Sequence, residues 1–388
     1  MQLFDYLHPV SSSILELLAQ SCSPKSLFHQ TQFVAPKTDE IGNYQLAVLG
    51  IPEDRFQDKL NGCSEAPDRI RMQLYALMKP RIDVKILDLG NIIKGNSFSD
   101  THIAVKEVVH ALIVQKVPVL ILGGSEDLIA AQYKAYKGIQ SNLQMVVVDS
   151  RVNMHIHAEE DKQSYLPRII TAHPNYLFNI TQAGYQSYFV EPETYDAFER
   201  MNFDMLRLGA LRGNIQDLEP YCRNADMLAF SMNAIRASDA PAQQGASPNG
   251  FNGEEACQIA RYAGASNDIS SFGIYNLLPH MDQGEISIAL AAQMAWFFIE
   301  GIMNRRMEYP SLESNDYMIY RTTSKNADEE IVFYKSLMSN RWWMEVPYPR
   351  ERSHQEGKFL VPCSYKDYQS ALNEELPDRW LKTYQKLL

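Results

Sequence analysis

Short apolar runs recur along most of the chain and are separated by longer segments with a helical pattern. Eight runs of four to seven residues are rich in Val, Ile, Leu and Met, which is typical of strands buried on both faces of a sheet. These strand candidates are Leu46–Ile51, Val84–Leu89, Val117–Leu122, Leu143–Asp149, Tyr176–Ile180, Met205–Leu208, Met227–Met232 and Ser271–Tyr275.

The segments between these runs carry apolar residues at helical spacing. The helix candidates are Ala66–Met78, Asp100–Gln115, Leu128–Gly138, Pro192–Met201, Gly253–Tyr262 and Gln283–Asn304. Alternation of strands and helices predicts an α/β fold with three layers, in which a mainly parallel sheet of about eight strands lies between helices. Because ligands of such sheets bind beyond the carboxyl ends of the strands, we expect any small-molecule ligand there.

One stretch, MVVVDSRVNMHIH at 145–157, places polar groups at regular spacing directly after a buried strand. Asp149, Arg151 and Asn153 follow at i, i+2 and i+4, so an extended backbone would point all three side chains to one side. His155 and His157 continue the same spacing and are candidate ligand-binding residues. A His-x-His pair can bind zinc or iron, but two ligands do not complete a metal site, and a polar loop is the commoner explanation.

The pattern changes near Pro310. The segments DYMIYRTT, EEIVFYKS, RWWMEVPYP and KFLVPCS are short aromatic and β-branched runs separated by polar turns, which predicts antiparallel strands. We therefore expect an α/β domain over 1–310, with about 40 residues as a lead-in, and a β-rich extension over 311–388. Two arrangements of the extension stay open, a separate antiparallel unit or an edge extension of the main sheet that packs Trp342 and Trp343 against the core.

Charge and cysteine content restrict the class of protein. The chain of 388 residues has a formal net charge of -11 and no long basic run, which argues against nucleic acid or an anionic membrane as a partner. Its five cysteines are scattered without a CxxC pair, as in reduced cytoplasmic proteins. The most apolar window, Ile286–Ile299, is shorter than a bilayer span and is interpreted as a core helix.

Several motifs at predicted strand ends resemble those of a known family. GGSED follows VPVLIL, DSRVN follows MVVV, and FSMNAIRASDAP and an NGF loop come later. In this order and spacing, over roughly Leu46–Arg305, they resemble the ureohydrolases, which include arginase, agmatinase and formimidoylglutamase. AIRASDAP, NGF and FGIYNLLP are most similar to the formimidoylglutamase-like branch. The resemblance implies an arginase-like fold, hydrolysis of C–N bonds in linear amidines, and homo-oligomers.

The resemblance also implies six ligands for two manganese ions, and most of these positions are substituted here. The family's motifs GGDHS, DAHxD and SFDxD place its ligands on Glu126, Asp149, Arg151, Asn153, Ser231 and Asn233. Asp149 alone matches, and Arg151 would put a permanent cation where a divalent ion belongs. We therefore expect no manganese, and we expect Arg151 to replace the metal as a cation held between Asp149 and Glu126.

Three further residues each allow a functional and a structural interpretation. Glu255 falls where the family has a substrate-contacting glutamate, which makes it a candidate catalytic residue, but it could equally cap the start of a helix. Arg236 could bind a ligand carboxylate, and Asp239 is a second ligand-binding candidate, or the two could pair with each other, which is slightly favoured.

Two functional classes follow from these observations. The first, which the substitutions favour, is a pseudoenzyme that keeps the ureohydrolase fold for ligand binding or assembly. The second is a hydrolase of linear amidines with a rebuilt site. Fold alone does not decide between them.

Overall fold

The computed structural model describes residues 3–33, 38–55, 62–154, 164–310, 315–324, 327–348 and 357–388. Within this part of the chain, ten strands form one sheet in the order β1-β4-β3-β5-β10-β9-β6-β7-β8, with β2 paired to β4. β1 is antiparallel to β4, and the other neighbouring pairs are parallel. The strands are β1 Leu7–His8, β2 Thr31–Gln32, β3 Leu46–Gly50, β4 Ile86–Ile92, β5 Val119–Leu122, β6 Leu143–Val148, β7 Leu177–Tyr185, β8 Asp204–Arg207, β9 Met227–Ser231 and β10 Ser271–Tyr275.

The eight predicted strands correspond to β3 through β10, which confirms the predicted mainly parallel sheet. The prediction missed β1 and β2. Each of these strands has only two residues, so neither produces an apolar run.

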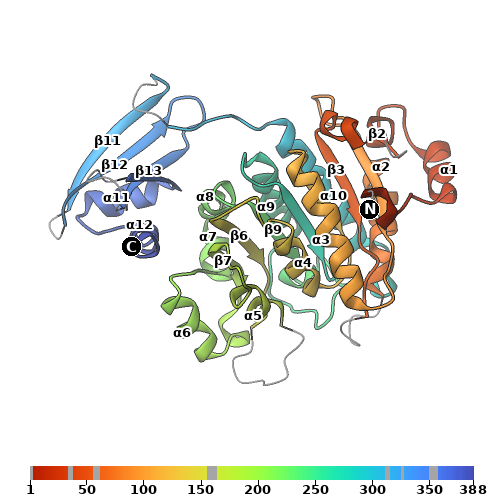
Figure 1. The fold of residues 1–388 in the computed structure, drawn as a ribbon, viewed down its shortest axis with the longest axis horizontal. Coiled ribbons are helices and arrows are strands. Elements are labelled where there is room, and N and C mark those ends of the chain that lie inside the picture. The colour runs from red at the N-terminus through yellow and green to blue at the C-terminus, as the bar shows by residue number, and fades with distance from the viewer. Residues whose placement is uncertain are drawn as a thin grey trace.

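Helices cover both faces of this sheet (Figure 1). Side chains alternate along each strand, so each strand contributes apolar residues to both faces. In β3, Leu46 and Val48 belong to one apolar cluster, whereas Ala47 and Leu49 belong to the other. The first cluster includes residues of α1 Ser12–Ser21, α2 Ala66–Ala76, α7 Leu208–Gly213, α8 Glu219–Arg223, α9 Gly253–Ala265 and α10 Ile286–Met303. The second includes residues of α3 Phe98–Val114, α4 Ile129–Lys134, α5 Tyr165–Ile170 and α6 Pro192–Arg200.

The apolar helix α10 is part of the first layer. Ile286–Met303 has the length and composition of a membrane span, but 61% of that window is buried inside the protein. Ile288, Met294 and Phe298 lie in the same apolar cluster as α2 and α9. This helix is therefore a core element, as its sequence predicted.

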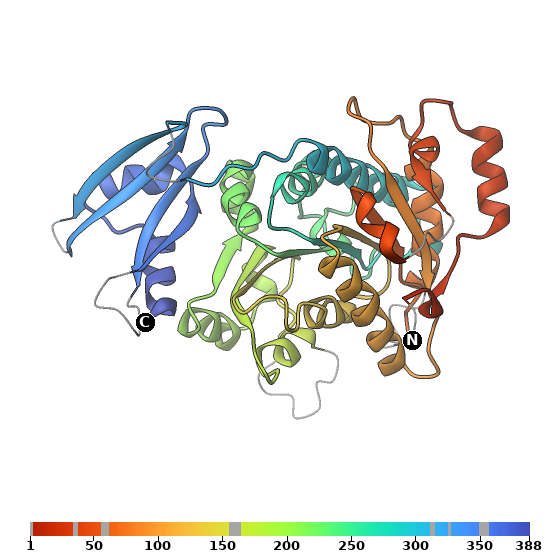
Figure 2. The ribbon, with the colours of Figure 1, turned by 45° about the horizontal axis from the view of Figure 1, so that its top comes forward.

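The C-terminal segment forms a second sheet, which lies beside the main domain rather than within its sheet (Figures 1 and 2). Its antiparallel strands are β11 Tyr317–Ser324, β12 Ala327–Ser336, β13 Trp342–Tyr348 and β14 Gly357–Cys363. Two helices that the sequence analysis did not predict follow, α11 Tyr365–Leu372 and α12 Asp378–Leu387. We refer to residues 315–388, in their described part, as the C-terminal unit.

The C-terminal unit has apolar clusters of its own. Trp342 packs with Phe333, Val361 and Trp380, and Trp343 packs on the opposite face of the sheet with Tyr334. The interpretation as an edge extension of the main sheet is wrong, since β11 to β14 form a sheet of their own. That the two units are separate domains divided near Pro310 stays a prediction.

Candidate functional site

Four adjacent strands bring polar side chains together at their carboxyl ends. In the sheet order β5-β10-β9-β6, these strands lead into Glu126, Asn276, Ser231 and Asp149 respectively. The residues are up to 150 positions apart in sequence, yet parallel strands place their ends along one edge. We call these four residues, together with Asn153, the strand-end cluster.

Two glycines allow the chain to turn from β5 toward this cluster. Gly123 and Gly124 adopt φ values of +79° and +81°, a region that L side chains rarely occupy. A Cβ on Gly123 would lie 2.6 Å from Cδ of Pro67, and a Cβ on Gly124 would lie 2.3 Å from Cδ1 of Leu128. The GG pair is therefore required by both conformation and space.

Glu126 and Asp149 form a carboxyl pair at the centre of the cluster. Burial and then the charge of Asp149 raise the pKa of Glu126 well above its usual value. Burial also raises the pKa of Asp149, which is 4% exposed. Because two adjacent carboxylates repel each other, these raised pKa values favour one proton shared by the pair.

Side-chain and backbone groups donate hydrogen bonds to the carboxyl oxygens of this pair. Asn153 Nδ2 donates to Glu126 Oε1 at 2.7 Å, and Asn276 Nδ2 donates to Glu126 Oε2 at 2.8 Å. Asn276 Oδ1 in turn accepts from the Glu126 backbone N–H at 3.0 Å. Asp149 Oδ1 accepts hydrogen bonds from the backbone N–H of Arg151 at 3.0 Å and from Ser150 Oγ at 3.4 Å.

Asn276 is a central residue of the cluster that the sequence analysis missed. Its Nδ2 also contacts Ser231 Oγ at 3.2 Å, so one side chain joins three strand ends. Its φ of +62° is tolerated by Asn better than by most residues. The signal was an Asn directly after the apolar run FGIY, in the FGIYNLLP segment to which no role was assigned.

The prediction that Arg151 bridges the two acids is wrong. Arg151 is exposed, and its guanidinium carbon lies 3.9 Å from the centre of the Phe189 ring. No ion pair joins it to Asp149 or Glu126, all three of which are described residues. The extended backbone that the prediction required ends at Val148, so the i, i+2 alternation does not continue to Arg151.

The remaining predicted residues lie at several places. Asn233 is next to the cluster, where its N–H contacts Ser231 Oγ at 3.3 Å and its buried Oδ1 accepts no hydrogen bond from any described residue. His155 and His157 lie outside the described residues.

Glu255, Arg236 and Asp239 gather at the start of α9. Glu255 forms a capping box with Asn252, with both hydrogen bonds at 2.8 Å. Arg236 donates to Asp239 at 2.8 and 3.1 Å, and Asp239 also accepts from the N–H of Gly253. The contacts thus match the structural interpretation of all three residues, while a role in ligand binding stays a prediction.

Comparison with known proteins decides the family. A sequence profile described as the arginase family matches residues 44–300, more than half of the 388 residues. The chain belongs to the arginase family. It is similar to a formimidoylglutamase of Geobacillus sp. (strain WCH70), with 24% identity over 266 residues that cover 63% of this chain and 80% of that protein. The ureohydrolase resemblance, including its formimidoylglutamase-like branch, is confirmed.

Solved structures of arginase-family proteins share the fold. Trypanosoma cruzi formiminoglutamase with Mn²⁺ superposes with a TM-score of 0.62 at 16% identity, covering 71% of this chain and 97% of that one. Bacillus subtilis formimidoylglutamase gives 0.61 at 16% identity, covering 71% and 95%. Agmatine ureohydrolase of Thermoplasma volcanium gives 0.59 at 20% identity, covering 74% and 98%.

The family implies a pair of manganese ions, and the chemistry of the donors at the strand ends does not fit them. Manganese requires oxygen or imidazole ligands with free lone pairs. Here the two carboxyl groups contact each other, and the atoms of Asn153 and Asn276 that face Glu126 are NH₂ donors. Across the described residues, no group of three or more His, Cys, Asp or Glu side chains could hold a metal ion.

Proposed function

We propose that this chain is an arginase-family pseudoenzyme, which keeps the fold for ligand binding or assembly and lacks the dinuclear manganese centre. The observation that supports this most is the strand-end cluster, in which a hydrogen-bond donor faces each oxygen of Glu126 and Oδ1 of Asp149. A water molecule activated by two metals would need those same oxygens as metal ligands. In this proposal, hydrogen bonds among the substituted residues take the place of metal coordination.

The test measures manganese retention by the wild type and by a variant that restores the family's ligand residues. Wild-type protein incubated with excess manganese and desalted should retain far less than one equivalent by elemental analysis. It should release no detectable product from formiminoglutamate, agmatine or arginine. A manganese-bearing formimidoylglutamase treated in parallel is the positive control. A stoichiometric manganese pair in the wild type would overturn the proposal.

A revertant sharpens the result. Glu126→His, Arg151→His, Asn153→Asp, Ser231→Asp and Asn233→Asp together restore the residues that the family resemblance implies at these positions. If the substitutions alone account for the lost centre, this variant should gain manganese and the wild type should not. Equal, low retention by both proteins would place the cause elsewhere in the site.

The second candidate is hydrolysis of linear amidines by a rebuilt site. The names of the relatives favour it, since formimidoylglutamases and an agmatine ureohydrolase share this fold. Product release by metal-free wild type, abolished by Asp149→Asn, would support it.

The remaining proposals concern setting and partners. The net charge of -11 supports a protein that binds neither nucleic acid nor membranes. Cytoplasmic localisation and a homo-oligomeric state are likewise proposals, which fractionation and light scattering would test.

A further inference from the structure

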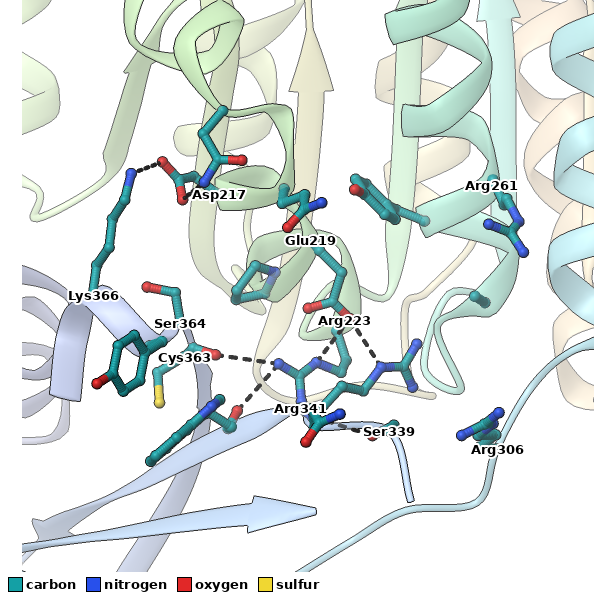
Figure 3. A pocket seen from close by; sticks show the side chains of 18 of the residues that line it. Asp217, Glu219, Arg223, Arg261, Arg306, Ser339, Arg341, Cys363, Ser364 and Lys366 are labelled. Carbon is teal, nitrogen blue, oxygen red and sulfur yellow. Dashed lines mark hydrogen bonds and ion pairs between the residues drawn. The ribbon is translucent and has the colours of Figure 1, made fainter. Parts of the chain in front are cut away.

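A cleft of about 700 Å³ lies between the α/β domain and the C-terminal unit (Figure 3). On one side it is lined by α8 and by the C-terminal ends of α9 and α10, and on the other by the turn before β13 and the start of α11. No residue of the strand-end cluster lines it. Its volume is within the range of small-molecule sites, roughly 300–1,000 Å³.

The lining of this interdomain cleft is basic in an acidic protein. Its charged residues are Arg223, Arg261, Arg306, Arg341 and Lys366, together with Asp217 and Glu219. Two acids beside the lining, Glu300 and Glu308, pair with Arg261 at 3.1 Å and approach Arg341 at 3.6 Å. Five cations thus face four carboxylates in a chain whose formal net charge is -11.

Arg223 is the buried cation of the cleft. Its side chain is 8% exposed, and its guanidinium stacks 4.3 Å above the Trp343 ring. Nη2 donates to the carbonyls of Trp342 and Cys363, and Nε lies 3.2 Å from Glu219. Nη1 is buried and has no hydrogen-bond partner among the described residues.

The neighbouring arginines also have donors to spare. Arg341 Nε lies 3.1 Å from the same oxygen of Glu219 that contacts Arg223, so two guanidinium groups share one carboxylate oxygen. Arg306 is exposed, and its guanidinium donates to the carbonyl of Met338 at 3.1 Å. Guanidinium donors form planar forks that match carboxylate and phosphate groups, and a shared carboxylate satisfies only some of them.

We propose that the interdomain cleft binds a small organic anion carrying two or more carboxylate or phosphate groups, held by Arg223, Arg306 and Arg341. Such a ligand would contact both units at once, because Arg223 comes from α8 and Arg341 precedes β13. The alternative is that these cations only fasten the units and neutralise the ends of α9 and α10. That alternative accounts for Nη2 of Arg223, but it leaves Nη1 and most donors of Arg306 without a role.

The experiment is calorimetric titration of the full chain with citrate and with pyrophosphate. Each titration is run against sodium chloride at equal ionic strength, which corrects for general screening. We expect saturable binding of at least one anion and a matching rise in melting temperature. Citrate binding indicates a polycarboxylate ligand, and pyrophosphate binding indicates a phosphorylated one.

Variants locate the binding site. Arg306→Gln removes an exposed cation without breaking a carboxylate pair, so the fold should be kept and the affinity should fall about tenfold. Arg341→Gln should weaken binding by a similar factor. The matched control is Arg321→Gln on β11, since Arg321 pairs with Glu330 at 2.7 Å and does not line the cleft.

Three outcomes would overturn the proposal. The first is that neither anion binds the wild type. The second is that Arg306→Gln and Arg341→Gln bind the anion as tightly as the wild type does. The third is that Arg321→Gln loses as much affinity as these two variants. The site is distinct from the strand-end cluster, so these outcomes do not depend on the manganese titration.

Discussion

The strand-end cluster and the interdomain cleft both contain charged side chains from elements far apart in sequence, but the hydrogen-bond partners of these charges differ. At the strand ends, Glu126 accepts hydrogen bonds from the amides of Asn153 and Asn276, and Asp149 accepts one from the backbone N–H of Arg151. In the cleft, Arg223 and Arg341 share Glu219 and leave donors unused. The carboxyl groups at the strand ends thus have several hydrogen-bond donors, whereas the cleft has a buried arginine nitrogen without a partner among the described residues.

If the metal positions of the family are rebuilt as we propose, amides rather than a cation take the place of the metal. A cation that replaces a metal would have to enter a crowded edge of the sheet and align with two acids. Neutral amides achieve the same compensation with shorter side chains, because each brings a donor without adding charge. The carboxyl pair is thereby stabilised by hydrogen bonds instead of by a counter-charge.

The largest expected effect on stability follows from substitution of Arg223, which lines the cleft. Arg223→Met should lower the free energy of unfolding by about 3 kcal/mol, because two carbonyls lose a buried charged donor, while Glu219 keeps its contact with Arg341. The two lost hydrogen bonds join the units. Urea unfolding measures the change.

Arg321→Met is the matched control for this variant. Arg321 is 54% exposed and its ion pair with Glu330 lies on the surface, so its loss should cost less than about 1 kcal/mol. Equal stability of Arg223→Met and the wild type would show that the guanidinium does not hold the units together.

The second largest expected effect on stability concerns Asn276, a central residue of the strand-end cluster. Asn276→Ala should cost about 2 kcal/mol, since it removes one of the two side-chain donors to Glu126 and places alanine at a φ of +62°, which asparagine tolerates better. Asn276→Gly removes the same hydrogen bonds but accepts that φ, so it should cost about 1 kcal/mol less. If alanine and glycine are equally harmful, the backbone conformation contributes nothing.

Much of this architecture was predictable from the sequence, and the reasons are local. The strands β3 through β10 are apolar runs, and the motifs after them sit at strand ends in any parallel sheet. Arg151 was misplaced because backbone extension past Asp149 cannot be read from residue types. Asn276 was missed because its partners come from strands distant in sequence. The C-terminal helices were missed because aromatic runs dominated that segment.

A third prediction uses the raised pKa of Glu126. The folded state holds more protons than the unfolded chain at pH values between the usual glutamate pKa, about 4.3, and the raised folded value. Wild-type stability should therefore fall as the pH rises through this window. Glu126→Gln cannot titrate, so between pH 5 and 8 it should gain on the order of 1 kcal/mol relative to wild type.

The control for this profile is Glu330→Gln, which removes a surface carboxylate that is 43% exposed. Its stability should run parallel to that of wild type across the same pH range. A profile of Glu126→Gln that also runs parallel to wild type would mean that the carboxyl pair does not share a proton in the folded state.

The smallest expected effect distinguishes the two roles considered for Arg151. As a bridge between two buried acids it would be worth about 3–5 kcal/mol, but as an exposed cation over the Phe189 ring it should contribute about 0.5–1 kcal/mol. Urea unfolding of Arg151→Met, Phe189→Leu and the double variant gives the coupling energy of this pair directly. We expect a coupling of that small size and no change in it with added manganese. A loss of several kcal/mol in Arg151→Met that persists in the Phe189→Leu background would mean that the guanidinium is held by the acids after all, and the strand-end cluster would then be compensated by a charge rather than by amides.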